Sequence, residues 1–355
     1  MKAKKLSALL LAAVMIFSLA ACGSKTPKTD SNATRIFTDS TGREVEVPAQ
    51  IDKVALSGPL AQIVLFALCP DKLVGVSNAW SSEAQEFLDE KYFNMPQIGQ
   101  LYGGKGELNL ETLLQSGAQV VIDVGESKGS IKEDMDSLQQ QTGIPFVHIS
   151  ADMQSYPQAY RMLGDLLGMK TEAEALATYC EKIYSRTETI ASGAEKANVL
   201  YVTGDMGQNV IAKGAYHAEI LDMLTNNLAQ VDEPSSKGTG NEVSMEQILT
   251  WNPDVVIFAP ESIYATVKDD AAWQSVTAIK NGAYYEVPFG PYNWMGFPPS
   301  VQRYLGMVWL SKLLYPDATA DYDLFADVQE YYKLFYHCDI TRAQYDALVA
   351  NSIGK

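Results

Sequence analysis

Two acidic side chains occupy matching positions in a phrase that the chain contains twice. GELNLETLLQSGAQVVI begins at Gly106 and NEVSMEQILTWNPDVVI begins at Asn241, and the two align without gaps at a spacing of 135 residues. The alignment places Glu111 on Glu246 in the first turn of a short predicted helix, where a carboxylate complements the helix dipole or serves as a cap. A carboxylate at the same place on two lobes also indicates a symmetric surface for a symmetric partner.

Aromatic and polar side chains gather in the loops that follow predicted strands. In two-lobed α/β proteins the ligand binds in the crevice at the carboxyl ends of the strands, so these loops form the candidate ligand site. Their rings give broad apolar contact at low entropy cost. The predicted ligand-binding residues are Trp80, Tyr102, Glu126, Tyr216, His217, Tyr264, Tyr292, Trp294 and Arg303.

Packing is the alternative role for several of these side chains. We expect some of the loop aromatics only to pack loops against the lobes. Arg303, in PPSVQRYLG, either reaches an anionic ligand or pairs with a helix neighbour, and the sequence leaves both roles open.

Motifs for metal binding and catalysis are sparse. His148, His217 and His337 are far apart in the sequence, whereas a receptor for bare zinc or manganese needs several histidine and carboxylate ligands in one place. The chain lacks a phosphate-loop pattern, a GxGxxG after a strand and an HExxH, and no GxSxG elbow of an acyl-transfer serine is predicted. We therefore predict no catalytic residues, no metal site and no cofactor. The chain is not expected to be an enzyme, and a surface-anchored hydrolase is the remaining enzyme alternative.

The N-terminus predicts export and anchoring. Residues 1–21 combine three early lysines with an apolar run, which is typical of a secretory signal and too short for a stable membrane span. Leu19-Ala20-Ala21-Cys22 resembles a bacterial lipobox, in which the cysteine is acylated and becomes the new N-terminus. An ordinary signal peptide that contains a cysteine is the alternative. Residues 22–34 are polar and predict a flexible tether after lipidated Cys22.

Strand and helix patterns alternate along the remaining chain. Short β-type runs at 54–56, 73–76, 120–122 and 146–149 are separated by helical patterns at 61–68, 83–89, 110–115 and 131–141, and a second such series begins at 199. Further helices are predicted at 156–167 and 299–314. This alternation predicts an α/β fold in which each lobe has a largely parallel sheet flanked by helices. The predicted parts are an N-terminal lobe at 35–170, one long connecting helix at 171–192, a C-terminal lobe at 193–325 and packing helices at 326–355. Asp339 is the predicted N-cap of the last of these helices. A helical connector is stiff, so we expect modest lobe closure.

Composition narrows the class of partner. The chain has 27 basic and 43 acidic side chains, a net charge of −16, which argues against nucleic-acid binding. Cys69, Cys180 and Cys338 lie in apolar or helical contexts without CxxC spacing, so we expect buried free thiols.

The mature chain resembles the solute-binding lipoproteins of ABC importers, in the helical-backbone class that carries siderophore-bound iron, haem and cobalamin. The resemblance rests on the signal, on DSTGREVEVPAQIDKVALS at 39–57, and on LNLETLLQSGAQVVI and VSMEQILTWNPDVVI. In that family one glutamate on each lobe docks onto arginines of the permease dimer, and by motif these positions are Glu111 and Glu246. Bidentate arginine–carboxylate pairs suit such positioning.

The resemblance implies a monomeric receptor, lipid-anchored on the extracytoplasmic face of the cell membrane. It would capture an iron-siderophore, haem or cobalamin-type metal complex in the interlobe cleft and deliver it to an ABC permease dimer with its ATPase. A receptor for a small oxyanion, such as molybdate or tungstate, or for a nickel complex is the alternative.

Overall fold

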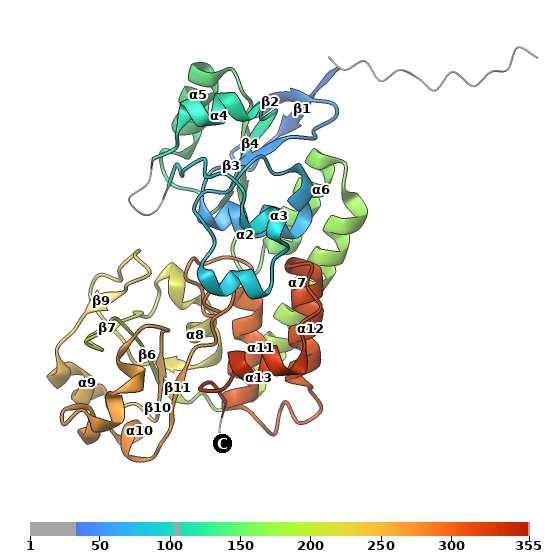
Figure 1. Ribbon diagram of the computed structural model, residues 1–355. Helices are drawn as coiled ribbons and strands as arrows, with labels where there is room; N and C mark the ends of the chain where they lie inside the picture. The colour runs from blue at the N-terminus through green and yellow to red at the C-terminus, as the bar shows by residue number, and fades with distance from the viewer. Residues whose placement is uncertain (1–32, 103–106, 354–355) are drawn as a thin grey trace, which may run out of the picture.

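Two lobes lie one above the other, with helices stacked along one side of both (Figure 1). The computed structural model describes residues 33–102 and 107–353. The predicted signal, Cys22 and most of the predicted tether fall outside these residues, as does the segment 103–106. Within the described residues, no helix has the length and apolarity needed to cross a membrane.

The first lobe is built on a small parallel sheet of order β3-β4-β5. All residues of β3 and β4 are buried, as expected for parallel strands covered on both faces. A separate antiparallel hairpin, β1-β2, precedes the sheet. The elements are β1 (Thr34–Thr38), β2 (Glu44–Pro48), β3 (Val54–Leu56), α2 (Pro59–Leu68), α3 (Glu90–Phe93), α4 (Leu110–Ser116), β4 (Val120–Gly125), α5 (Ile131–Thr142), β5 (Phe146–Ser150) and α6 (Tyr156–Leu167), with 3-10 turns at η1 (Pro70–Lys72) and η2 (Ser82–Glu86).

The second lobe has a mixed sheet of order β11-β10-β6-β7-β9, with β8 also paired to β6. Its centre is parallel, because β10 runs parallel to both β6 and β11, while β7 and β9 add an antiparallel edge. The elements are β6 (Asn198–Thr203), β7 (Asn209–Val210), η3 (Tyr216–Ala218), α8 (Glu219–Leu224), β8 (Asn226–Asn227), β9 (Asn241–Glu242), α9 (Met245–Trp251), β10 (Val255–Phe258), η4 (Ile263–Ala265), η5 (Val267–Asp269), η6 (Trp273–Ser275), α10 (Thr277–Lys280) and β11 (Tyr284–Glu286).

One long helix joins the lobes. The predicted connector is α7 (Lys170–Gly193), and its 24 residues span about 36 Å at 1.5 Å each. It packs against α2 and α6 of the first lobe and against α8, α11 (Arg303–Leu314) and α12 (Leu324–Phe335). The chain ends with α13 (Arg342–Leu348). The predicted α/β, two-lobed architecture is confirmed.

The repeated phrase is also repeated in structure. Asn109 and Ser244 are the N-caps of α4 and α9, and each side chain accepts a hydrogen bond from the backbone three residues later. Gly117 and Asn252 end the two helices in the left-handed conformation. The glutamates in the first turn therefore do not supply the side-chain caps.

Three local predictions are wrong. The expected strand at 73–76 makes only isolated bridges, from Leu73 to Val54 and from Val76 to Gln97. Instead of a helix, Ser82–Glu86 forms a 3-10 turn. The expected helix at 299–314 begins at Arg303, because the residues before it form turns, in which the Arg303 amide donates to the Ser300 carbonyl three residues back at 3.1 Å.

The C-terminal helices cover the join between the lobes. Tyr331, Tyr332 and Phe335 of α12 are fully buried, as expected for packing helices. The predicted N-cap of the last helix, Asp339, is wrong: Thr341 caps α13 and forms a reciprocal capping box with Gln344.

The free thiols divide by burial. Cys69 and Cys180 are buried and Cys338 is half-buried, and burial raises the pKa of Cys69 to about 12. The expectation of buried thiols therefore holds for two of the three.

Candidate functional site

A cavity of about 410 Å³ lies between the two lobes. Clefts of this volume commonly hold small organic ligands. Both lobes contribute walls, and several of the loops predicted for the ligand site take part. The lining residues are Ser57, Gly58, Pro59, Leu60, Ala61, Asn78, Gln100, Tyr102, Asp123, Val124, Gly125, Glu126, Lys128, Tyr216, His217, Ser236, Gly238, Phe297, Pro298 and Pro299.

The carboxyl ends of β3 and β4 form the first-lobe side of this cavity. In the parallel register Leu56 lies opposite Ile122, and the Ser57 amide donates to the Ile122 carbonyl at 3.1 Å. Gly125 ends β4 at a φ of 142°, where a Cβ atom would lie 2.9 Å from Leu60 Cδ2. Only glycine suits this conformation and this close approach of the strand end to α2.

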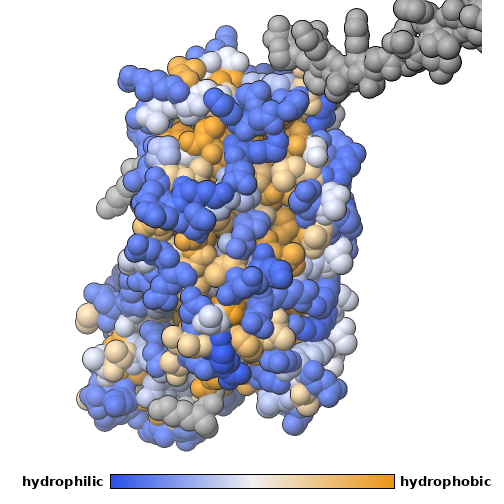
Figure 2. Space-filling model, turned by 45° about the vertical axis from the view of Figure 1, so that its right-hand side comes forward, coloured by the Kyte–Doolittle hydropathy of each residue, from blue (hydrophilic) through white to orange (hydrophobic). Residues whose placement is uncertain are grey.

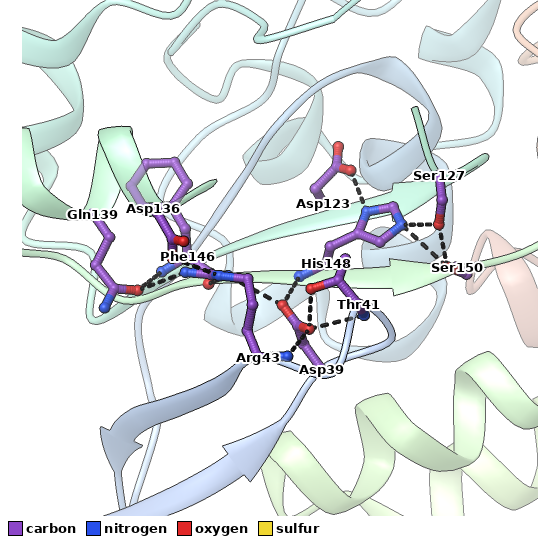
Figure 3. Close-up of polar contacts among 10 residues, drawn as sticks. All are labelled: Asp39, Thr41, Arg43, Asp123, Ser127, Asp136, Gln139, Phe146, His148 and Ser150. Carbon is purple, nitrogen blue, oxygen red and sulfur yellow. Dashed lines mark hydrogen bonds and ion pairs between the residues drawn. The ribbon is translucent and has the colours of Figure 1, made fainter. Parts of the chain in front are cut away.

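A buried hydrogen-bond chain runs from the cavity into the lobe (Figure 3). Asp123 accepts from the Ser57 hydroxyl, and its other oxygen lies 2.6 Å from Nδ1 of His148. The ionised carboxylate only accepts, so the ring proton belongs on Nδ1. Nε2 then accepts from Ser127 at 2.9 Å or from Ser150 at 3.2 Å.

A second network holds the strand that carries His148. Asp39 accepts from the His148 amide at 3.4 Å and from Nη1 of Arg43 at 3.1 Å (Figure 3). Burial acts to raise the pKa of Asp39, but hydrogen bonds from Thr41, Arg43 and His148 outweigh it and lower the pKa. Arg43 also donates to the Phe146 carbonyl at 2.8 Å. These contacts fix β5 against the β1-β2 hairpin.

The hydrogen bonds run from Asp123 to His148 to Ser127, as in a serine-hydrolase triad, and residues 125–129 carry the letters GxSxG. The surroundings differ from those of a reactive serine. Ser127 is not among the described non-glycine residues with positive φ, so it does not have the strained backbone of a nucleophile elbow. His148 is fully buried, and protein groups engage both ring nitrogens. The network therefore positions hydroxyls beside the cavity.

Tyr102, Glu126 and Lys128 lie together on the first-lobe wall. Lys128 Nζ is 4.5 Å from the centre of the Tyr102 ring, a cation–π contact. The Tyr102 hydroxyl donates to Asp134, and burial followed by this carboxylate raises the pKa of Tyr102. The phenol is therefore protonated at neutral pH and serves as a neutral group.

Tyr216 and His217 form the facing wall from η3. The Tyr216 hydroxyl donates to the Ala151 carbonyl of the first lobe at 3.0 Å, and burial raises the Tyr216 pKa. Burial lowers the pKa of His217, so its ring is neutral at pH 7. Its Nδ1 lies 3.0 Å from the Gly296 carbonyl, which only accepts, so the proton belongs on Nδ1. His217 thus lines the cavity as a neutral polar group.

Arg303 lies behind Tyr216 and is fully buried. It forms an ion pair with Glu219, donates from Nη1 to the Tyr216 carbonyl at 3.0 Å, and stacks 4.8 Å from the Tyr216 ring centre. Burial raises the pKa of Glu219, and Arg303 partly offsets this rise. Of the two roles that the sequence left open for Arg303, the structure shows pairing with a neighbouring helix.

The other predicted aromatics are also outside the set that lines the cavity. Trp80 is buried and donates to the Tyr92 carbonyl at 3.0 Å. Tyr292 accepts from Gln62 at 3.1 Å, and Trp294 is fully buried. Tyr264 packs 5.8 Å from the Tyr284 ring within the second lobe. These four rings contact other residues of the lobes, which is the packing role expected for some of the loop aromatics.

Sequence reasoning missed several polar residues of the cavity, namely Gln100, Asp123, Lys128 and Ser236. One signal was readable: Asp123 is the only charged residue in the strand VVIDVG, and a charge inside a buried strand calls for a partner. The others lie in loops with no regular pattern.

The predicted docking glutamates lie away from this cavity, one on each lobe. Glu111 is in the first turn of α4 and Glu246 in the first turn of α9 (Figure 1). Both side chains are exposed. The two acids that align in the sequence therefore occupy equivalent positions in two equivalent helices.

Comparison with known proteins identifies the family. The family model described as "Periplasmic binding protein" matches residues 54–290. The chain belongs to this family. As a periplasmic binding protein it is an extracytoplasmic solute receptor of an ABC transporter and not an enzyme.

Three relatives illustrate the likeness. The molybdate-binding protein MolA of Haemophilus influenzae is 24% identical over 334 residues, which are 86% of this chain and 91% of MolA. A solved ABC transporter solute-binding protein from Sulfurospirillum deleyianum has a TM-score of 0.81 and 26% identity, covering 89% of this chain and 99% of that one. The catecholate-siderophore binding protein VctP of Vibrio cholerae has a TM-score of 0.54 and 17% identity, covering 72% and 91%.

Proposed function

We propose that this periplasmic binding protein captures a metal complex of the iron-siderophore, haem or cobalamin type and delivers it to an ABC permease. The observation that supports this most is the chemistry of the interlobe cavity. Its volume of about 410 Å³ suits an organic complex, and its walls combine apolar surface with neutral hydrogen-bonding groups.

The charges of the cavity favour a metal that is already chelated. Tyr102 and Tyr216 are protonated, so neither phenol supplies the anionic oxygen that a bare ferric ion prefers. His217 is neutral and adds a polar ring to the wall without adding charge. Among the described lining residues, Asp123 and Glu126 are acidic and Lys128 is basic.

A small oxyanion is the second candidate, because MolA is a named molybdate-binding relative. The ammonium of Lys128 is a group that binds such an anion. The carboxylates of Asp123 and Glu126 oppose it by repulsion across the same small volume. A nickel complex fits the neutral donors as well as an iron complex does.

We infer that Glu111 and Glu246 dock the loaded receptor onto a permease dimer. Their exposure and equivalent placement on two lobes support a two-fold partner that offers arginines. Changing both residues to Ala should abolish uptake of ligand and leave ligand affinity nearly unchanged. Loss of affinity in this variant would contradict the docking role.

We also propose that acylated Cys22 anchors the protein on the extracytoplasmic face of the membrane and that residues 22–34 tether it. Mass spectrometry of the protein purified from membranes tests this directly. A diacylated or triacylated N-terminal cysteine is expected, and an unmodified peptide that begins elsewhere would contradict it.

Calorimetric titration of the purified protein separates the ligand classes. The ligands are ferric hydroxamates, ferric catecholates, haem, cobalamin, a nickel complex and molybdate. Saturable binding of a metal complex, weakened by Glu126→Gln in the cavity and unchanged by Glu133→Gln on exposed α5, supports the proposal. Tight binding of molybdate alone would favour the oxyanion receptor instead.

A further inference from the structure

Two exposed leucines occupy equivalent places on the two lobes. Leu114 on α4 is 51% exposed, and Leu249 on α9 is 38% exposed. They match each other in the sequence repeat, 135 residues apart. Their chain neighbours Leu113 and Ile248 are fully buried, so the inward apolar position of each helix is already filled. Packing within the lobes therefore does not explain the outward leucines.

Each leucine shares a helix face with a docking glutamate. Leu114 follows Glu111 by three residues, and Leu249 follows Glu246 by three residues. Side chains at this spacing are neighbours on the surface of a helix. Each lobe thus presents a carboxylate beside an apolar side chain. A lone exposed leucine is ordinary, but the same pair in both lobes marks one surface repeated.

We propose that Leu114 and Leu249 are apolar anchors of the permease-docking surface, each inserting beside its glutamate into one half of a two-fold symmetric permease dimer. This inference rests on the proposed docking function of Glu111 and Glu246. The partner it fits has, in each subunit, an apolar pocket bordered by basic side chains. A second copy of this chain fits poorly, because its net charge of −16 and its own glutamates would oppose the contact.

The two kinds of side chain have separable effects on binding. Exposed carboxylates orient the encounter with a basic partner, and salt screens their contribution over a Debye length of about 8 Å at physiological ionic strength. Burial of the leucines contributes through removal of apolar surface from water, which salt does not screen. Because each leucine is already about half-covered, its loss should weaken binding about fivefold.

Photo-crosslinking in cells that produce the full-length protein identifies what these positions touch. Benzoylphenylalanine replaces one residue at a time, and the four positions are Leu114, Leu249, Ile36 and Thr112, which lies beside Glu111. Ile36 lies on β1 outside the repeat and is 59% exposed, so it is a matched control. We expect both leucine positions, but not Ile36, to crosslink a membrane-spanning subunit of an ABC importer, identified by mass spectrometry.

Binding of the purified protein to that importer in nanodiscs then measures the anchors. Leu114→Gln with Leu249→Gln should lower affinity about 20-fold at both low and high salt, while Glu111→Gln with Glu246→Gln should act mainly at low salt. Ile36→Gln should change nothing. Retained ligand affinity in calorimetry shows that the variants are folded.

The outcomes separate the inference from the function it rests on. If the leucine variants bind normally while the glutamate variants fail, the anchors are overturned and docking by the glutamates stands. If Thr112 and both leucine positions capture no importer subunit, or capture a second copy of this chain, the docking function and the anchors are both overturned.

Discussion

The hydroxyl of Tyr216 donates to the carbonyl oxygen of Ala151 at 3.0 Å, and this bond joins the second lobe to the first beside the cavity. Deeper in the join, Tyr304 donates to the Met153 carbonyl at 2.7 Å. Together with α7, these bonds hold the lobes at a defined spacing.

On the face drawn in Figure 2, hydrophilic residues cover most of the surface, with smaller apolar patches between them.

Removal of the Tyr216 hydroxyl should loosen this join. Tyr216→Phe keeps the ring beside Arg303 but leaves the Ala151 carbonyl without its donor, so we expect the free energy of unfolding to fall by about 1 kcal/mol. Small-angle scattering should also show a wider spread of lobe spacings. Tyr264→Phe is the control, because that hydroxyl lies 3.4 Å from the Asn351 carbonyl at the surface of the second lobe. Equal behaviour of the two variants would mean that the cross-lobe bond has no special role.

The neutral ring of His217 gives a pH dependence of known sign. Its pKa in the folded protein is lowered by burial below the usual value of about 6.5, so the unfolded chain takes up the proton first as pH falls. The folded state therefore loses stability relative to the unfolded chain as pH falls below about 6.5 toward the folded pKa. His217→Gln, which can still donate to the Gly296 carbonyl, should lack this loss. Urea unfolding at pH 7.5, 6.5 and 5.5 measures it; parallel pH profiles of the two proteins would refute the assignment.

The Asp123–His148–Ser127 hydrogen bonds resemble those of a catalytic triad, but we predict that their role is structural. Ser127→Ala should lower the free energy of unfolding by about 1 kcal/mol, since the buried Nε2 keeps Ser150 as a partner at 3.2 Å. We expect neither the parent protein nor this variant to hydrolyse p-nitrophenyl acetate above the buffer rate. Turnover by the parent that Ser127→Ala removes would show that the serine is a nucleophile.

Much of the architecture was predictable because it follows from regular periodicity. The strand VVIDVG and the helix at 156–167 carry patterns that tertiary packing reinforces, and both lie where the sequence predicted them. The segment at 73–76 has the apolar letters of a strand but pairs only through single bridges, because strand pairing depends on neighbours that are distant in sequence.

The cavity was less predictable than the fold. Strand ends located the loops of Ser57 and Glu126, because the carboxyl ends of parallel strands meet at one edge. Residue type alone did not separate Tyr216, which faces the cavity, from Trp294, which is fully buried. That distinction depends on side-chain direction within irregular loops, for which the sequence has no period.

Substitution of Gly238 should change the cavity wall at little cost to the stability of the fold. A Cβ atom at this position would lie 2.2 Å from the Phe297 ring, which must then move. Phe297 is 56% exposed, so its ring can rotate into solvent at little cost in stability. We expect Gly238→Ala to change the free energy of unfolding by less than about 1 kcal/mol and to change ligand affinity at least about tenfold, because Phe297 lines the cavity.

Gly193→Ala is the matched control, since a Cβ atom there meets nothing within 4 Å and the position lies at the end of α7. Calorimetric titration and urea unfolding of both variants give the two quantities side by side. Unchanged affinity in Gly238→Ala would show that the ligand does not contact the Phe297 wall. A large loss of stability would show instead that Phe297 cannot move, because the lobes hold it more firmly than its exposure indicates.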